Sequence, residues 1–373
     1  MKLSGITRHV DHLIVQWPDG SSSRFHYVWL RDNCRCNRCK HAIGERTVDV
    51  LSIPCDIAPT SVVVTDGLDL AWPDGHVTTY EAAWLRANSY EVDQRPAPHR
   101  PILWRKELAA DLPEISYDDV MHSDAGLLAW LHLLRDYGLC FVRGVPTDPR
   151  TVVDVAGRIS FLRNTNFGIL FDVESKPDPD SLAYTSNRLN CHSDLPNREM
   201  PPGLQFLHCL VFEATGGDSI LVDAFACADE LRRVDPAAFE LLTTTPIRYR
   251  YSGPDSELSA RSPIIRVDAD GELFEIRYSN ALLAPLDAAP EKMIDTYRAI
   301  HSFAGLLQSS DFEIKTRLRA GDLMSFHNNR VLHGRDVFDP NSGHRHLQGC
   351  YVDLDDFLSR IRVLERLSGL SSA

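Results

Sequence analysis

His192-Ser193-Asp194-Leu195-Pro196 is the stretch from which fold and chemistry can be inferred, together with a further histidine, His333, far downstream. Two histidines and one carboxylate can hold one face of an iron(II) ion and leave the other face open, as in non-haem oxygenases. In an extended strand, residues i and i+2 point to the same side, so His192 and Asp194 can bind one metal together. We therefore predict an iron site of His192, Asp194 and His333.

The same tripeptide also occurs as His122-Ser123-Asp124, which serves as an internal comparison. It lies in the segment 116–137, whose apolar periodicity, cap at Ser116 and stop at Gly138 predict a helix. At about 3.6 residues per turn, side chains two positions apart in a helix diverge by roughly 200° and cannot share a metal. Only the copy at 192–194 is therefore expected to bind one.

The composition is that of an acidic globular protein. Of its 373 residues, 43% are hydrophobic and 24% are charged, and the formal net charge is −13. This charge, without a basic run, argues against a nucleic-acid partner. The sequence has no apolar stretch of about 18 residues and no signal-peptide pattern, so we expect a cytoplasmic protein without a membrane partner. The nine cysteines are then expected to be thiols and metal ligands rather than disulfides.

The first 95 residues contain an internal repeat. Trp17-Pro18-Asp19-Gly20 recurs as Trp72-Pro73-Asp74-Gly75, and Trp29-Leu30-Arg31 recurs as Trp84-Leu85-Arg86, each pair 55 residues apart. Each copy has the pattern of a strand, a tight turn and a second strand or short helix. We expect a small β-rich domain of two similar halves at 1–95, a proline-containing linker at 94–101, and a second domain at 96–373.

The second domain is expected to be mainly β with peripheral helices. Helices are expected after Asp148-Pro149, after Asp235-Pro236 and at 290–307. Strand-like runs dominate the remainder: 139–142, 204–212, 219–223, 264–267, 272–278, 314–318, 323–326 and 346–352. Many strands with few helices favour a double-stranded β-helix, or jelly roll, over an alternating βαβ fold, and no glycine-rich phosphate loop is present.

Arg345, twelve residues after His333, stands at the head of the last strand-like run. A cosubstrate such as 2-oxoglutarate would chelate iron with its keto acid end and require a cation for its distal carboxylate. The planar guanidinium of arginine pairs bidentately with a carboxylate, which suits it to this role.

These features together resemble the taurine dioxygenase superfamily of iron(II)/2-oxoglutarate oxygenases, and within it the γ-butyrobetaine hydroxylase-like enzymes. The resemblance rests on His192-Ser193-Asp194-Leu195-Pro196, Pro201-Pro202-Gly203-Leu204-Gln205, Leu207-His208-Cys209, Gly216-Gly217-Asp218-Ser219, Leu332-His333-Gly334-Arg335 and Arg345-His346-Leu347. It implies Fe(II), 2-oxoglutarate and O2 as the cofactor and cosubstrates, a hydrogen bond from Ser219 to 2-oxoglutarate, and a homodimer.

Cys34-Arg35-Cys36-Asn37-Arg38-Cys39 resembles the zinc module of the same family, whose fourth ligand follows the Trp-Pro-Asp turn; here that residue is His76. Independently, Cys34, Cys36 and Cys39 with a histidine on a turn can complete a tetrahedral Zn(II) site without an open position. Such closed sites are structural rather than catalytic. The alternative is a cluster of surface thiols.

The resemblance also implies a substrate pocket. In γ-butyrobetaine hydroxylases a trimethylammonium group lies in an aromatic cage, and the matching positions here are Phe167, Phe171, Tyr184 and Tyr351. Leu195 stands where the mammalian enzymes have a tyrosine. The cage is therefore expected to be largely retained.

The acid end of the implied pocket departs further from the family pattern. Asn280 matches an amide that binds the substrate carboxylate, but Ser181 replaces a second asparagine, and Ala281 stands where many bacterial relatives carry arginine. His208, Cys209, Cys227 and Cys350 are expected to belong to the core.

The predicted function is hydroxylation of an aliphatic C–H in a small trimethylammonium acid, with γ-butyrobetaine to carnitine as the first candidate. An analogue with another acid end, such as (2-trimethylammonioethyl)phosphonate or trimethyllysine, is the alternative. A sulfonate oxygenase, a non-catalytic scaffold and a DNA-binding regulator are further alternatives. Four aromatic residues, an intact set of metal ligands and the acidic charge argue against these three in turn.

Overall fold

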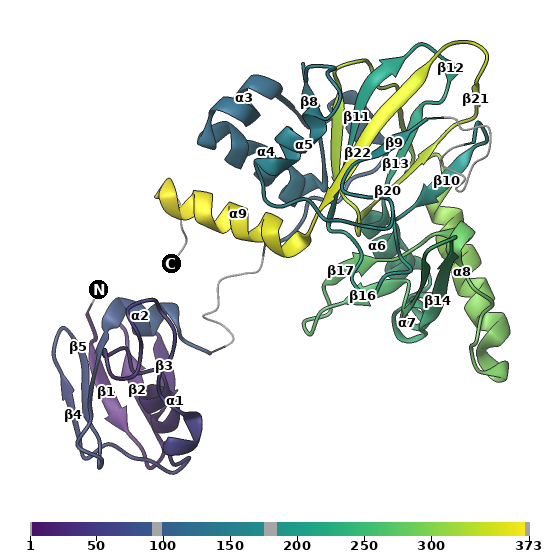
Figure 1. Ribbon diagram of the computed structural model, residues 1–373. Helices are drawn as coiled ribbons and strands as arrows, with labels where there is room; N and C mark the ends of the chain where they lie inside the picture. The colour runs from purple at the N-terminus through teal and green to yellow at the C-terminus, as the bar shows by residue number, and fades with distance from the viewer. Residues whose placement is uncertain (1, 92–98, 175–184, 370–373) are drawn as a thin grey trace. The chain divides into compact units, whose positions relative to one another are not determined.

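The computed structural model describes residues 2–91, 99–174 and 185–369, and the chain divides into two compact units, Met1–His99 and Arg100–Ser372. No helix within these described ranges is long and apolar enough to cross a membrane. Figure 1 shows both units.

The first unit consists of two antiparallel three-stranded sheets, each followed by one short helix. The first half comprises β1 (Gly5–Arg8), β2 (His12–Gln16), β3 (Ser22–His26) and α1 (Tyr27–Asp32). The second half repeats it as β4 (Ser61–Val64), β5 (Gly67–Ala71), β6 (Val77–Glu81) and α2 (Ala82–Ala87). A 3-10 turn, Val50–Ser52, lies between them. The expected two-part β-rich architecture is therefore present.

Equivalent residues of the two halves make equivalent contacts. The indole nitrogen of Trp17 donates to Ser23 Oγ at 2.8 Å, and that of Trp72 donates to Thr78 Oγ1 at 3.0 Å. These indoles are buried in one core to which both halves contribute. The repeat seen in the sequence is thus a repeat of hydrogen bonds as well as of strands.

Salt bridges between the two halves are reciprocal. Arg86 of the second half is 3.0 Å from Asp19 of the first, and Arg31 of the first half is 3.1 Å from Asp74 of the second. Each Trp-Pro-Asp-Gly turn is therefore held by an arginine from the other half.

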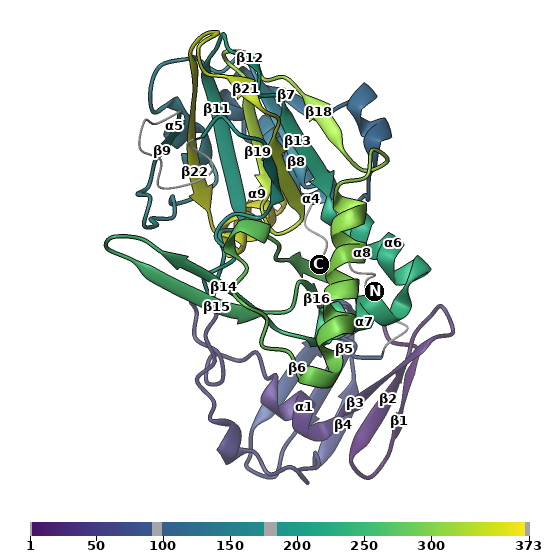
Figure 2. The ribbon, with the colours of Figure 1, turned by 90° about the vertical axis from the view of Figure 1, so that its right-hand side faces the viewer.

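The second unit is a jelly roll built from two facing sheets, which confirms the expected fold class (Figures 1 and 2). The larger sheet has the order β7 (Glu114–Ser116), β8 (Leu139–Arg143), β19 (Leu323–His327), β11 (Leu204–Phe212), β22 (Arg345–Val352) and β9 (Phe171–Val173). The smaller has the order β10 (Leu189–His192), β20 (Val331–Arg335), β13 (Ser219–Asp223) and β18 (Ile314–Thr316).

The other named strands in the described part of this unit form two-stranded ribbons: β12 (Thr215–Gly216) with β21 (Phe338–Asp339), β14 (Ile247–Ser252) with β15 (Glu257–Ser262), and β16 (Ile265–Val267) with β17 (Leu273–Ile276). Short 3-10 segments are Lys106–Ala110, Asn280–Leu282 and Pro290–Lys292. Figure 2 shows the β14–β15 ribbon as a long projecting hairpin.

Helices cover the outside of the two sheets in separate groups (Figure 1). The helices α4 (Asp124–Tyr137), α5 (Thr151–Gly157) and α9 (Leu354–Leu367) share a core with outward-facing residues of the larger sheet, and α3 (Tyr117–His122) contributes Val120 to it. The helices α6 (Ala224–Val234), α7 (Pro236–Thr244) and α8 (Met293–Leu307) pack against the smaller sheet and the ribbons. Between the sheets, inward-facing side chains such as Phe141, Leu221 and Phe326 form a further core, and others line a cavity beside it.

The expected single helix at 116–137 is wrong, because the segment forms two helices. α3 ends at His122, and Ser123 has extended φ and ψ angles and caps α4 by accepting a hydrogen bond from the Gly126 N–H at 3.1 Å. A Cβ on Gly126 would lie 2.2 Å from the Asp119 carbonyl oxygen, so the two helices approach each other closely at this glycine. The His122 tripeptide is therefore a helix junction.

Candidate active site and zinc site

His192 and His333 lie on neighbouring strands of the smaller sheet and face the same point. They are directly paired across β10 and β20, and their ring centroids are 4.4 Å apart. Asp194 Oδ1 lies 3.2 Å from His192 Nε2 and 3.8 Å from His333 Nε2. One ligand atom from each residue lies within 4.8 Å of the others, as expected of three ligands on one face of an iron(II) ion.

Asp194 is positioned by a turn rather than by the extended strand expected from the sequence. β10 ends at His192, and Leu195 has a left-handed backbone with φ +54°. The side chain of Asn328 holds this turn by accepting from the Asp194 N–H at 2.7 Å and donating to the Asp194 carbonyl at 3.0 Å. A left-handed backbone is unfavourable for leucine, so the surrounding contacts must stabilise this conformation.

Hydrogen bonds also orient the ligand side chains. Nδ1 of His192 is 2.9 Å from the Asn190 carbonyl, and a proton on Nδ1 leaves Nε2 free for a metal. Tyr351 donates its hydroxyl to Asp194 Oδ2 at 2.6 Å, while Oδ1 faces the two histidines. One carboxylate oxygen thus faces the two imidazoles and the other is held by a phenol.

The protonation states of His333 and Asp194 suit metal binding. Burial disfavours a charged His192, but its contact with the Asp194 carboxylate raises its pKa above the ordinary value, so a metal would replace a proton there. Burial and the neighbouring His192 lower the pKa of His333 to about 3, so its imidazole is neutral at physiological pH. Burial by itself raises the pKa of the Asp194 carboxyl, but the two histidines and the Tyr351 hydroxyl hold it below its ordinary value. A carboxylate and neutral imidazole are the forms that coordinate a cation.

A cavity of about 450 Å³ opens from this triad into the jelly roll. Arg345, at the start of β22, lines it and is 8% exposed, and burial lowers the pKa of its guanidinium to about 10, so it remains charged at neutral pH. Among the residues that the structure describes, Arg345 forms no ion pair and its Nε has no hydrogen-bond partner. A buried cation without an anion is costly, and a carboxylate ligand would complete it.

Ser219 also lines the cavity, at the first position of β13. It is buried and pairs across the sheet with Arg335. Arg335 lines the cavity too, with its guanidinium donating to the Thr185 and Asn187 carbonyls at 2.6 and 2.8 Å.

Three of the four expected cage residues line the same cavity: Phe167, Phe171 and Tyr351. The rings of Phe171 and Tyr351 have centroids 5.1 Å apart. Phe167 packs edge-on against Tyr251 at 6.0 Å, and Tyr251 lines the cavity as well. The fourth expected residue, Tyr184, lies outside the described residues.

The expected polar residue Asn280 lines the cavity, as do Leu195 and Ala281, whereas Ser181 lies outside the described residues. Sequence reasoning missed Tyr251 and Asn197. Asn197 is 1% exposed, lines the cavity and has no hydrogen-bond partner for either side-chain amide atom in the described part of the chain. No local pattern marks either residue; only the tertiary fold brings them to the cavity.

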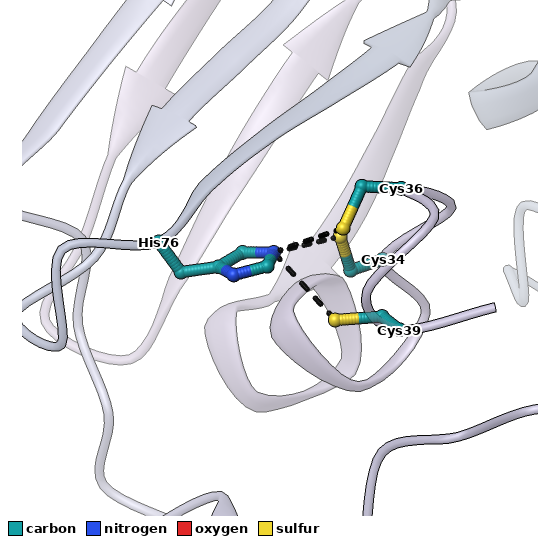
Figure 3. A group of neighbouring side chains, drawn as sticks. All are labelled: Cys34, Cys36, Cys39 and His76. Atoms are coloured by element: carbon teal, nitrogen blue, oxygen red, sulfur yellow. Dashed lines mark hydrogen bonds between the residues drawn. The ribbon is translucent and has the colours of Figure 1, made fainter.

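The first unit contains a separate metal-binding group of Cys34, Cys36, Cys39 and His76 (Figure 3). Nε2 of His76 lies 3.2, 3.4 and 3.6 Å from the sulfur atoms of Cys34, Cys36 and Cys39. Cys34, Cys39 and His76 are buried. Four converging donors without an open position fit a structural Zn(II).

The turn that carries His76 is built by the repeat. The Asp74 carboxylate accepts from the His76 N–H at 2.9 Å, and Arg31 both contacts Asp74 and donates to Cys39 Sγ at 3.5 Å. In the first half, Ser21 occupies the position of His76 and donates its N–H to Asp19 at 3.0 Å. The same turn thus carries a candidate metal ligand in only one of its two copies.

All nine cysteines lie in the described residues and all are free thiols. Cys209, Cys227, Cys350 and His208 are completely buried, as expected of core residues.

Comparison with known proteins gives concordant matches over nearly the whole chain. The family model for the taurine catabolism dioxygenase TauD, TfdA family matches residues 95–351, and that for the gamma-butyrobetaine hydroxylase-like N-terminal region matches residues 6–86. The chain is 46% identical to a gamma-butyrobetaine dioxygenase of Pseudomonas sp. (strain AK-1), over 94% of this chain and 93% of the relative. It is 35% identical to the mitochondrial trimethyllysine dioxygenase of Gallus gallus, over 95% and 87% of the two chains. A putative alpha-ketoglutarate-dependent taurine dioxygenase from Burkholderia xenovorans shares the fold, with a TM-score of 0.51 and 16% identity over 68% of this chain and 90% of that chain.

Proposed function

Since the chain belongs to the TauD/TfdA family of iron(II)- and 2-oxoglutarate-dependent dioxygenases, we propose that it hydroxylates γ-butyrobetaine to carnitine. The observation that carries the proposal is one cavity that joins a two-histidine, one-carboxylate triad to the rings of Phe167, Phe171 and Tyr351. The 46% identity to a gamma-butyrobetaine dioxygenase supports the same substrate.

We assign the ligands of the cavity as follows. His192, Asp194 and His333 hold iron(II), which together with 2-oxoglutarate and dioxygen supplies the oxidising power for C–H hydroxylation. The guanidinium of Arg345 binds the distal carboxylate of 2-oxoglutarate, and Ser219 donates a hydrogen bond to the same cosubstrate. No general base is required, because the chain's own contribution is to position one C–H and exclude water.

The substrate is oriented by its two unlike ends. The ring faces of Phe167, Phe171 and Tyr351 would hold the trimethylammonium group by cation–π attraction, worth about 0.5–2 kcal/mol for a good contact; Tyr184 is assigned to the same cage. The side-chain amide of Asn280 would bind the carboxylate.

Trimethyllysine is the second candidate substrate, for two reasons. Trimethyllysine dioxygenases are among the relatives of this chain, and at the acid end of the cavity Ala281 stands where many bacterial relatives carry arginine. The trimethylammonium end would be bound in the same way in both cases, so only the length and acid end of the substrate distinguish them.

The proposal extends to the organisation of the chain. We assign residues 1–95 to a zinc-binding domain and residues 96–373 to the catalytic domain. A cytoplasmic location is supported by the nine free thiols, which suit a reducing compartment. A homodimer is inferred from the family resemblance alone.

The test is coupled turnover under air with iron(II), ascorbate and 2-oxoglutarate. Succinate and the product heavier by one oxygen atom are measured with γ-butyrobetaine, trimethyllysine, (2-trimethylammonioethyl)phosphonate and taurine. We expect γ-butyrobetaine to give the highest kcat/KM. Turnover of taurine alone would overturn the cage assignment, and preference for trimethyllysine would replace the first candidate by the second.

A further inference from the structure

The outer face of the larger sheet carries a polar cluster directly behind the cavity. In β22, Arg345 and Leu347 line the cavity, so the alternate residues, His346 and Gln348, point outward. In β9, Phe171 and Val173 line the cavity, so Asp172 points outward opposite Gln348. Glu174 and His344, one step beyond on each chain segment, extend this outer face.

Two histidines and two carboxylates converge in this cluster. Nε2 of His346 lies 2.8 Å from Asp172 Oδ1 and 2.9 Å from Glu174 Oε1. Nε2 of His344 lies 3.6 Å from Glu174 Oε2, and the ligand atoms of His344, His346 and Glu174 all lie within 4.8 Å of one another. Ligands bound at about 2.0–2.2 Å around one tetrahedral zinc ion lie about 3.3–3.6 Å apart, which is close to the two histidine–Glu174 distances of 2.9 and 3.6 Å.

A single proton on His346 cannot bridge to both neighbouring carboxylates as well as a metal ion could. Nε2 of His346 can carry only one hydrogen, yet two carboxylate oxygens lie within hydrogen-bonding distance of it. Asp172 is fixed in place, because Gln348 donates to it at 2.9 Å and itself accepts from the Arg150 N–H at 2.7 Å. A cation between the imidazoles and the carboxylates would be shared by all of these groups.

We propose that His344, His346 and Glu174, with Asp172 beside them, form a third metal site of this chain, on the outside of the jelly roll. Imidazole nitrogen with carboxylate selects zinc and similar borderline divalent ions over calcium or magnesium, which prefer oxygen ligands alone. The site is partly exposed, with 56% of the His344 side chain accessible, so the fourth ligand is water. Its affinity is therefore weaker than that of the closed Cys3His site.

A metal bound there joins the edge strand β9 to β22. β9 pairs with β22 over only three residues, Phe171–Val173, and Phe171 on its inner face contacts Tyr351. Metal binding therefore reduces local opening of the strand that carries Phe171.

The experiment measures zinc binding by the full-length chain with its iron site disabled by Asp194→Ala. Zinc bound per chain is determined by equilibrium dialysis and elemental analysis in the Asp194→Ala parent and with His344→Ala or His346→Gln added. His132→Ala is the matched control, since Nε2 of His132 lies 2.9 Å from Glu365 in an ion pair with a single histidine.

The parent and the His132→Ala control are expected to bind one zinc beyond the structural ion. His344→Ala and His346→Gln should weaken that binding at least about tenfold, given the 10–100-fold effects of even indirect metal contacts. Hydrogen exchange of the β9 amides should slow on zinc addition in the parent and in the His132→Ala control, but not in His344→Ala or His346→Gln. Equal zinc binding in the parent and in both variants, with unchanged exchange in β9, would overturn the proposal and place any additional zinc elsewhere.

Discussion

Replacing Gly349 by alanine is expected to disturb the aromatic cage through a single steric contact. Gly349 of β22 pairs with Phe171 of β9, and a Cβ added to it would lie 2.5 Å from two ring carbons of Phe171 and 3.0 Å from Leu207 Cδ2. Carbon atoms in ordinary contact are about 3.5–4.0 Å apart. The ring of Phe171 must therefore move by about 1 Å, away from its position 5.1 Å from the Tyr351 ring.

The magnitude follows from the contact that is lost. Loss of one cation–π contact worth about 0.5–2 kcal/mol lowers kcat/KM for a trimethylammonium substrate by about 2–30-fold. The KM for 2-oxoglutarate and the iron content are expected to remain unchanged, because the substitution adds only a methyl group beside Phe171. Gly349 is not among the residues with positive φ, so alanine introduces no left-handed strain.

The assay is succinate formation with γ-butyrobetaine as substrate, using Gly157→Ala as the matched control. A Cβ on Gly157, the last residue of α5, meets no atom within 4 Å. The decisive comparison uses a Phe171→Leu background, in which no aromatic ring remains for the new methyl group to displace. In that background Gly349→Ala should lower kcat/KM little or not at all, which is the non-additivity that a double-mutant cycle measures.

An equal loss of kcat/KM on adding Gly349→Ala to wild type and to Phe171→Leu would refute the reasoning. An unchanged kcat/KM in the single variant would do the same. If Gly349→Ala lowered the thermal unfolding midpoint but left kcat/KM unchanged, the strands of the sheet would have moved to relieve the steric contact while the cage rings kept their positions.

Asp194→Ala should abolish coupled succinate formation and iron binding while one zinc per chain is retained, as measured by elemental analysis. Arg345→Ala should raise the KM for 2-oxoglutarate by about 10–150-fold, corresponding to about 1.5–3 kcal/mol for a lost charged hydrogen bond, with Arg345→Lys in between. Cys36→Ser should lose the structural zinc and lower the thermal unfolding midpoint. Burial lowers the pKa of His208 to about 4, so its contribution to stability is complete above pH 6.5 and is lost as pH falls toward 4; His208→Leu should remove about 2 kcal/mol of the drop between pH 7 and pH 5 in urea unfolding.

Each of these expectations has a result that contradicts it. Turnover by Asp194→Ala would contradict the assignment of Asp194 as an iron ligand. An unchanged KM for 2-oxoglutarate in Arg345→Ala would indicate that the distal carboxylate binds Arg335 instead. Full zinc content in Cys36→Ser would show that Cys36 is not a ligand. An identical acid dependence with and without His208 would mean that other groups determine it.

The candidate metal ligands could be proposed from the sequence because each set contains a short motif: His192 with Asp194, and Cys34, Cys36 and Cys39. The remaining member of each set, His333 or His76, lies far away in sequence and was proposed from the family pattern, and the structure brings each group together. The turn geometry at Leu195 could not be predicted, because the side chain that stabilises it, Asn328, is 134 residues from Asp194 in sequence.

The positions of strands could be predicted where consecutive residues along the strand are buried. The runs 204–212 and 219–223 match β11 and β13 to the residue; each contains a continuous or nearly continuous apolar stretch, and almost every residue of both strands is buried. The helices α6 and α9 and the β14–β15 ribbon were not anticipated. The first strand of the ribbon alternates tyrosine with arginine, and its tyrosine side is the more buried one. The pattern does not show what that side packs against, so the position of Tyr251 in the cavity depends on tertiary packing.

The reciprocal arginines of the first unit have a consequence for its folding. Arg86 forms an ion pair with Asp19, and Arg31 forms the equivalent ion pair with Asp74. Trp29 and Trp84, which are equivalent in the two halves, contact each other with ring centroids 5.6 Å apart. These are the contacts of a twofold-symmetric dimer whose subunits have become one continuous polypeptide. Both halves share one core and each turn aspartate pairs with an arginine of the other half, so we expect a fragment of one half to need a second copy of itself to fold.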